Sequence, residues 1–255
     1  MNTLTVIKSL LIIYLLLCVA VYVFQRSLIY HPADATEHNF NTLKITNDNH
    51  TVEALMTNHG ARDVIIYFGG NAENVAYSAT DFNQQFPQHS AYLMKYRGYS
   101  GAQGSASEAN LFADALTLFD HINQIPNTRI TVIGRSLGSG VATFLATERT
   151  VDKIILITPY DSIRSIAKSM FPIFPITWLL LDHYDSKSRI AKITAPTLVL
   201  MAANDQVIPQ VHTESLIQSI PKHLVNTTVF NAGHNDLDLM PEYFDTLRLF
   251  LDSKD

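Results

Sequence analysis

The stretch ITVIGRSLGSGVATFL, Ile130 to Leu145, runs from an apolar strand through two glycines into small and apolar residues. Ser136 stands at the centre of this change, with Gly134 two residues before it and Gly138 two residues after it. Small residues at these two places allow a sharp strand-to-helix turn in which neighbouring chain comes close. Such a turn projects the serine hydroxyl from the carboxyl edge of a sheet. The stretch therefore predicts a serine nucleophile on an α/β sheet.

A serine hydroxyl is a poor nucleophile unless a base takes its proton, and the base needs an acid that orients it. In folds with this turn, the acid and then the histidine follow the serine along the chain. Asp205 comes just after the strand-like PTLVLM, and His234 comes just after NTTVF. We predict that His234 is the general base for Ser136 and that Asp205 orients His234. Asp161, which follows the KIILIT strand, is the alternative acid.

The oxyanion that develops during attack on a carbonyl group needs two backbone N–H donors. The N–H group of Leu137, next to the nucleophile, is the first predicted donor. The second is expected in the loop FGGNAEN, Phe68 to Asn74, where two glycines allow an unusual turn and a helix is expected to start near Ala72. We assign the second donor to Asn71, with Gly70 as the alternative. An ordinary glycine turn is the competing interpretation.

The chain has 255 residues, of which 47% are hydrophobic, and this suits one large domain or two small ones, of which we expect one. Two short strands are expected at Phe40 to Thr46 and at Thr51 to Thr57, separated by a polar turn. A helix is expected from Ser105 to Ile125, with Ser105 and Glu108 as a capping box. The apolar runs that alternate with helical stretches are DVIIYF, AYLMKY, RITVIG, KIILIT, PTLVLM and NTTVF. This alternation predicts a mostly parallel central sheet with helices on both faces.

The first thirty residues form a separate apolar segment. Leu10 to Phe24 holds no charged residue, and extension back to Leu4 gives roughly 32 Å of helix, which is long enough to span a bilayer. We predict an uncleaved single-pass membrane anchor, with a cleaved signal peptide and a buried soluble helix as alternatives. Lys8 and Arg26 flank the segment almost evenly, so the side of the membrane on which the domain lies stays open.

Taken together, the motifs resemble the α/β-hydrolase superfamily, and more narrowly the membrane-anchored serine hydrolases grouped with α/β-hydrolase domain-containing protein 13 and its bacterial relatives. The likeness rests on FQRSLIYHP, YFGGNAEN, YRGYSGAQGSASE, GRSLGSG, TPYDSI, NDQVIP and GHND, which cover nearly the whole chain in order. It implies the same triad and a YRGYSG loop near the active site, which makes Tyr99 a candidate substrate contact. Two departures stand out: Gly69 replaces a histidine of the usual glycine loop, and Glu73 replaces a later glycine.

We expect residues 1–30 to form the anchor and linker, and residues 31–255 to form the hydrolase domain with a small helical cap at about 161–190. The cap stretch MFPIFPITWLLLDHYD carries the only tryptophan. Four of its side chains are candidates to line an acyl pocket or to touch the membrane, and the competing interpretation is that its apolar face packs on the core. These candidates are Phe171, Phe174, Trp178 and Leu179.

The predicted function is hydrolysis of carboxylic esters or thioesters, with acyl-chain substrates, by a serine hydrolase. The alternatives are a catalytically silent binding protein, a serine peptidase of the same fold, and an acyl transferase. A net charge of −5 without a Lys/Arg run gives no footprint for nucleic acid. The histidines lack metal-ligand spacing and no phosphate-binding glycine loop is present, so no metal and no cofactor are expected.

Overall fold

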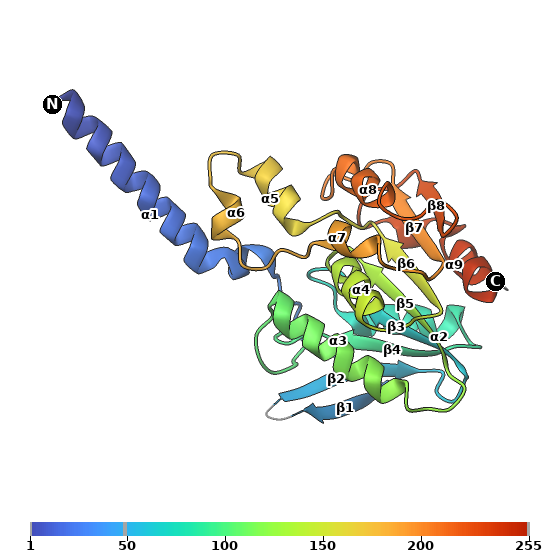
Figure 1. Ribbon diagram of the computed structural model, residues 1–255. Coiled ribbons are helices and arrows are strands. Elements are labelled where there is room, and N and C mark those ends of the chain that lie inside the picture. Colours follow the sequence, from blue (N-terminus) through green and yellow to red (C-terminus); the bar gives the residue numbers. More distant parts are fainter. Residues whose placement is uncertain (1, 48–49, 254–255) are drawn as a thin grey trace.

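The computed structural model describes residues 2–47 and 50–253, so Asp48 and Asn49 in the predicted polar turn lie outside the described residues. A mixed sheet runs through the body in the order β1-β2-β4-β3-β5-β6-β7-β8 (Figure 1). The pairs β1–β2 and β2–β4 are antiparallel, and each of the other neighbouring pairs is parallel. The strands are β1 (Asn41–Asn47), β2 (His50–Thr57), β3 (Asp63–Phe68), β4 (Ser90–Lys95), β5 (Arg129–Arg135), β6 (Lys153–Ile157), β7 (Thr197–Ala202) and β8 (Val225–Phe230).

Helices cover both faces of this sheet, as the sequence predicts. Side chains alternate between the faces along each strand: Ile66 of β3 packs in a core with α3, α4, α7 and α8, and Ile65 packs in a second core with α2 and α9. The described helices are α1 (Thr3–Ile29), α2 (Val75–Gln85), α3 (Glu108–Ile122), α4 (Leu137–Glu148), α5 (Ile163–Met170), α6 (Ile176–Leu179), α7 (Ser186–Ile190), α8 (Gln210–Ile217), the short 3-10 helix η1 (Leu237–Leu239) and α9 (Tyr243–Asp252).

Two predicted helix starts are wrong. Helix α3 begins at Glu108 and is capped by Ser107, whose hydroxyl accepts from the backbone N–H of Asn110. Glu108 does not close the expected capping box with Ser105, because its carboxylate accepts the backbone N–H of His183 instead. Helix α2 begins three residues later than expected, at Val75.

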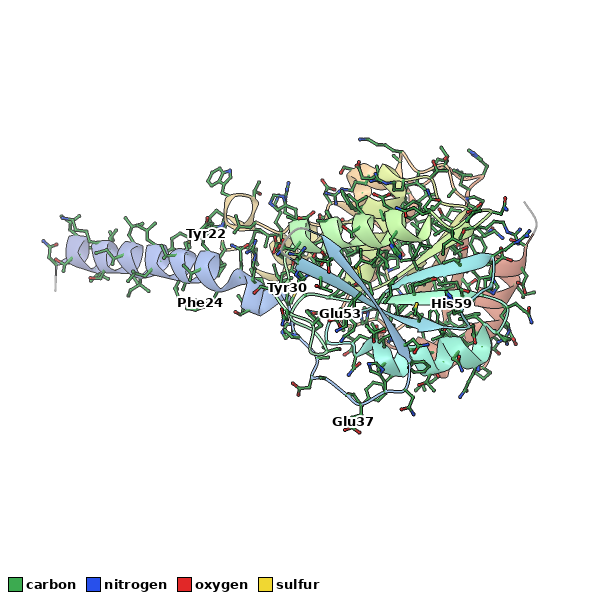
Figure 2. The ribbon with its side chains drawn as sticks, turned by 90° about the horizontal axis from the view of Figure 1, so that it is seen from below. Tyr22, Phe24, Tyr30, Glu37, Glu53 and His59 are labelled. Carbon is green, nitrogen blue, oxygen red and sulfur yellow. The ribbon has the colours of Figure 1, made fainter. Side chains whose placement is uncertain are left out.

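Helix α1 projects from the body as a rod (Figures 1 and 2). Tyr22 and Phe24 lie on the projecting part, whereas Tyr30 lies where the chain enters the body (Figure 2). Its 27 residues span about 40 Å, and by length and composition it can cross a membrane. The side chains along it are almost all exposed, so the alternative of a buried soluble helix is wrong. The choice between anchor and signal peptide, like the domain boundaries, stays a prediction.

Candidate active site

The turn after β5 holds Ser136 in a conformation that L-residues rarely adopt, with φ 48° and ψ −115°. The two glycines predicted to permit this turn are needed for close packing. A Cβ atom on Gly138 would collide with the carbonyl oxygen of Phe68, and a Cβ atom on Gly134 would collide with the carbonyl oxygen of Gly138. Because β3, β5, β7 and β8 run parallel, the loops after them meet at the same edge of the sheet as Ser136.

The three predicted triad residues come together at this edge. Nε2 of His234 lies 2.9 Å from Oγ of Ser136, and Nδ1 of His234 lies 2.7 Å from Oδ2 of Asp205. The other oxygen of Asp205 accepts the backbone N–H groups of Val207 and Ile208, at 2.9 and 2.7 Å. The side chains of His234 and Asp205 are buried, so solvent screens their interaction little. This arrangement can remove a proton from the serine hydroxyl and return it.

The alternative acid, Asp161, does not contact His234. It pairs instead with Nδ1 of His212 at 2.9 Å, and Nε2 of His212 lies 3.3 Å from the hydroxyl of Ser169. This second Ser-His-Asp group resembles the triad in composition only, because the Ser169 hydroxyl donates to the carbonyl of Ile166 at 2.8 Å. The group connects α5 to α8.

The two predicted oxyanion donors remain available. The N–H of Leu137 opens α4, and neither this group nor the N–H of Asn71 has an acceptor within the described ranges. Gly70, the alternative donor, is not available, because its N–H donates to Oε2 of Glu73 at 2.6 Å. Of the two candidates for the second donor, Gly70 and Asn71, only Asn71 therefore has an N–H group without an acceptor among the described residues.

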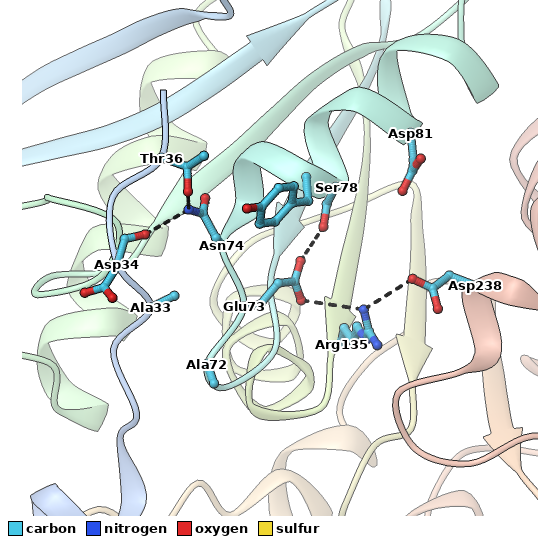
Figure 3. A pocket seen from close by; sticks show the side chains of 11 residues that line it. Ala33, Asp34, Thr36, Ala72, Glu73, Asn74, Ser78, Asp81, Arg135 and Asp238 are labelled. Carbon is cyan, nitrogen blue, oxygen red and sulfur yellow. Dashed lines mark hydrogen bonds and ion pairs between the residues drawn. The ribbon is translucent and has the colours of Figure 1, made fainter. Parts of the chain in front are cut away.

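Glu73 holds this loop in place (Figure 3). Its Oε1 accepts the hydroxyls of Tyr67 at 2.8 Å and Ser78 at 2.5 Å, and its Oε2 lies 3.9 Å from the guanidinium of Arg135. Burial disfavours the charge on Arg135, but nearby Tyr67 and Glu73 outweigh this and raise the pKa of its guanidinium above the ordinary value. A Cβ atom on Gly69 would stand 3.1 Å from the Glu73 carboxyl carbon. The two departures from the family pattern, Gly69 and Glu73, therefore depend on each other. A side chain at position 69 would crowd the carboxyl group of Glu73.

Asn71 also connects the oxyanion loop to the end of α1. Its side-chain amide donates to the carbonyl of Ile29 at 2.7 Å, and its oxygen accepts the backbone N–H of His31 at 2.9 Å. The same oxygen accepts the hydroxyl of Tyr99 at 2.7 Å. Burial raises the pKa of Tyr99 to about 12, so this hydroxyl stays a donor at neutral pH.

A cavity of about 420 Å³ opens beside the nucleophile, bounded by Ser136, His234 and Asn71 together with His31 and Val207. A second cavity of about 400 Å³ adjoins it and shares Glu73 and Arg135 with it (Figure 3). No group of three or more His, Cys, Asp or Glu side chains in the described part of the chain could hold a metal ion.

None of the five predicted substrate contacts lines the cavity beside Ser136. Tyr99 is buried behind Asn71. The other four, Phe171, Phe174, Trp178 and Leu179, lie in the connection between β6 and β7, in the part of it that runs beside α1 (Figure 1). Ala72, Glu73 and Arg135 also line the cavity, and they lie in the loop and the turn that the sequence singles out. Outside those two stretches and His234, prediction from sequence missed three lining residues: His31, Val207 and Asn235. The available signal was their place in the motifs YHP, NDQVIP and GHND.

No protein-family model matches this sequence. An uncharacterized protein of Mycobacterium tuberculosis is 35% identical over 167 residues, which cover 64% of this chain and 59% of that relative. Alpha/beta hydrolase domain-containing protein aho-3 of Caenorhabditis elegans is 31% identical over 62% of this chain and 47% of its own length. An uncharacterized membrane protein of Saccharomyces cerevisiae is 28% identical over 82% of this chain and 78% of its own. The matches thus span less than two thirds of the mycobacterial and nematode relatives.

Solved structures resemble the whole body of the protein. Esterase Pf2001 of Pyrococcus furiosus superposes with a TM-score of 0.67 at 14% identity, covering 87% of this chain and 96% of that one. Est1E from Butyrivibrio proteoclasticus superposes with a TM-score of 0.66 at 13% identity, covering 84% and 99%. The protein has the α/β-hydrolase fold, and its relatives are consistent with that superfamily.

Proposed function

We propose that this protein is a membrane-anchored serine hydrolase that cleaves carboxylic esters or thioesters of acyl chains. The observation that carries the proposal is the chain of contacts from Ser136 through His234 to Asp205 beside an open cavity. The esterases with the same fold support the reaction class by analogy.

In the proposed mechanism the hydroxyl oxygen of Ser136 attacks the carbonyl carbon of the substrate while His234 takes the hydroxyl proton. Asp205 stabilises the imidazolium that forms and keeps its ring oriented. The carbonyl oxygen gains negative charge and is met by the N–H groups of Leu137 and Asn71.

The tetrahedral intermediate then collapses, and the bond between the carbonyl carbon and the leaving-group oxygen or sulfur breaks. His234 gives its proton to that leaving group, which departs as an alcohol or a thiol. The acyl group stays bound as an ester of Ser136 until a water molecule, deprotonated by His234, attacks the same carbon. A second collapse releases the carboxylic acid and restores the serine.

The membrane part of the proposal rests on α1, which is apolar and projects from the body. The relative from yeast, which is described as a membrane protein, supports it. We propose residues 1–30 as anchor and linker, residues 31–255 as the hydrolase domain, and about 161–190 as its cap segment. An acyl-chain substrate fits an active site held beside a membrane.

The rival functions use the same fold differently. A silent binding protein has no need for a serine held in a strained turn at 2.9 Å from a histidine nitrogen, so this contact favours catalysis. A peptidase or an acyl transferase would use the same three residues and differ in the acceptor or in the bond that is cleaved. Product analysis with and without an added alcohol separates transfer from hydrolysis.

The first test is labelling of the full chain by a fluorophosphonate probe. Wild type is expected to label, whereas Ser136→Ala and His234→Ala, shown to be folded by circular dichroism, are expected not to label. Ser169→Ala is the matched control, because Ser169 also faces a histidine that is paired with an aspartate. Labelling of Ser136→Ala, or loss of labelling in Ser169→Ala, would show that the nucleophile is a residue other than Ser136.

Ester and thioester substrates of increasing acyl length then test the acyl-chain preference. Strict preference for acetyl over octanoyl esters would count against acyl-chain substrates.

A further inference from the structure

The connection between β6 and β7 exposes a cluster of large apolar side chains in residues 170–181. Trp178 is 84% exposed and Ile173 is 70% exposed, and Met170, Phe171 and Leu181 are each about half exposed or more. Five exposed large apolar side chains within twelve residues indicate a place where the surface meets a partner or a lipid phase.

Residues 170–181 lie along α1 and contact it at two levels. The hydroxyl of Tyr14 donates to the carbonyl of Ile173 at 2.8 Å, and the Tyr14 ring stacks on the Phe174 ring. Further along the helix, the amide of Gln25 donates to the carbonyl of Leu179 at 3.0 Å and its oxygen accepts the N–H of Leu181 at 2.6 Å. The two levels are about 16 Å apart along the helix. The segment therefore shares the surroundings of the apolar part of α1.

The apolar character of α1 and of residues 170–181 ends at the same level. On α1 the uncharged stretch gives way to Arg26, and in the segment Leu181 gives way to Asp182. These two charged side chains pair with each other at 3.2 Å. Where two neighbouring apolar elements both reach their first charged residue at the same level, that level is typical of a boundary between a lipid phase and water.

We infer that residues 170–181 enter the bilayer beside α1 and form a second membrane contact of the hydrolase. This inference rests on the proposed membrane anchoring. It also puts the active-site cavity at the membrane surface, because His31, two residues beyond α1, lines that cavity. Acyl-chain substrates then reach Ser136 from the lipid–water interface.

Trp178 is the only tryptophan of the chain and reports directly on this contact. The full chain is reconstituted into phosphatidylcholine vesicles with unlabelled acyl chains or with acyl chains that carry bromine, which quenches tryptophan at close range. We expect brominated lipid to lower the emission of Trp178 about twofold, as for an aromatic ring buried at the acyl boundary. Emission that is unchanged by bromine and readily quenched by aqueous acrylamide would overturn the inference.

Two further variants move the tryptophan within a Trp178→Phe background. Leu249→Trp, on the exposed side of α9, is the matched control and is expected to show no bromine quenching. Leu11→Trp, within α1, tests the anchor itself. If bromine quenches Leu11→Trp but not Trp178, α1 is a membrane anchor and the inference about residues 170–181 is wrong.

If bromine quenches neither tryptophan, the proposed membrane anchoring is wrong as well. Fluorophosphonate labelling in the same vesicles then shows whether the proposed hydrolase activity still holds. Shielding of Trp178 that depends on protein concentration and not on lipid would mean that a second copy covers this surface.

Discussion

At the scale of single residues, Ser136 has a strained backbone at the centre of the proposed active site. Its positive φ and its ψ of −115° cost an L-residue on the order of 1–3 kcal/mol. The surrounding structure enforces this conformation through a backbone bond from the Ser136 N–H to the carbonyl of Ile157 and through the tight approach at Gly138. In this conformation the Ser136 hydroxyl lies 2.9 Å from Nε2 of His234.

This strain predicts an unusual order of stability. Ser136→Ala and Ser136→Gly are both expected to lose activity, and the glycine variant is expected to be more stable than the alanine variant by about 1 kcal/mol, because glycine adopts positive φ without a Cβ clash. Thermal unfolding of the two purified variants measures the difference.

The matched control is the same pair of changes at Ser215, which lies in α8. There glycine is expected to be less stable than alanine by about 1 kcal/mol, the ordinary cost of glycine in a helix. If alanine is the more stable residue at position 136 too, the backbone of Ser136 is not strained in solution.

Single residues also show what sequence can predict. The meeting of Ser136, Asp205 and His234 at one edge of the sheet could be predicted because each follows a recognisable strand and parallel strands bring their carboxyl ends together. Chain order could not choose between Asp205 and Asp161, because both lie between Ser136 and His234. The contacts that separate them, Asp205 with His234 and Asp161 with His212, are visible only in three dimensions. The coupling of Gly69 to Glu73 likewise depends on the approach of two atoms across a turn.

At the scale of elements, the loop after β3 connects the end of α1 to the oxyanion site. The Asn71 side chain holds the carbonyl of Ile29 and the N–H of His31, while the Asn71 backbone N–H is the proposed donor. Truncation of the Asn71 side chain keeps the backbone N–H donor but removes the hydrogen bonds to Ile29 and His31 that position it. Because small displacements of an oxyanion donor matter in the transition state, the rate should fall more than the affinity.

Asn71→Ala is therefore expected to lower kcat about tenfold with little change in KM, measured with a soluble ester. Tyr99→Phe is the graded control, since it removes the hydroxyl that donates to Asn71 and accepts the N–H of His31, but leaves the bonds from Asn71 to Ile29 and His31. It should give a smaller loss. A raised KM with unchanged kcat would assign Asn71 to substrate binding, and no change in either would show that the loop does not need α1.

Errors of prediction at this scale share a physical cause. Ser105 and Glu108 fit a capping box locally, but Glu108 bonds to the chain at His183 and Arg189, far along the sequence. Phe171, Phe174, Trp178 and Leu179 have the composition of an acyl pocket, yet none of them lines the cavity beside Ser136. Their segment contacts Tyr14 and Gln25 of α1. Local patterns predict the elements, and long-range partners decide where the elements begin and lie.

At the scale of the whole molecule, a buried polar junction joins α1 to the body. Asp182 accepts the guanidinium of Arg26 at 3.2 Å and the hydroxyl of Tyr30 at 3.0 Å, and the Tyr30 hydroxyl lies 2.9 Å from that of Tyr184. Burial raises the pKa of Tyr30 far above its ordinary value, so its hydroxyl remains a donor to Asp182. This junction fixes the direction in which the proposed anchor leaves the hydrolase domain.

Removing the acceptor should loosen the junction without unfolding the body. In Asp182→Ala the Arg26 side chain, which is already half exposed, returns to water, and the Tyr30 hydroxyl keeps Tyr184 as a partner. We therefore expect the free energy that holds α1 to the body to fall by about 1–2 kcal/mol. A loss of about 1.4 kcal/mol corresponds to a tenfold rise in the open population, and trypsin should cleave after Arg26 about tenfold faster in detergent solution. Asp182→Asn is the control, because its amide oxygen still accepts the Tyr30 hydroxyl and should restore most of the resistance. Equal cleavage rates in wild type and Asp182→Ala, with labelling of Ser136 intact, would mean that the other contacts of α1, with Asn71 and with residues 170–181, are enough to hold it in place.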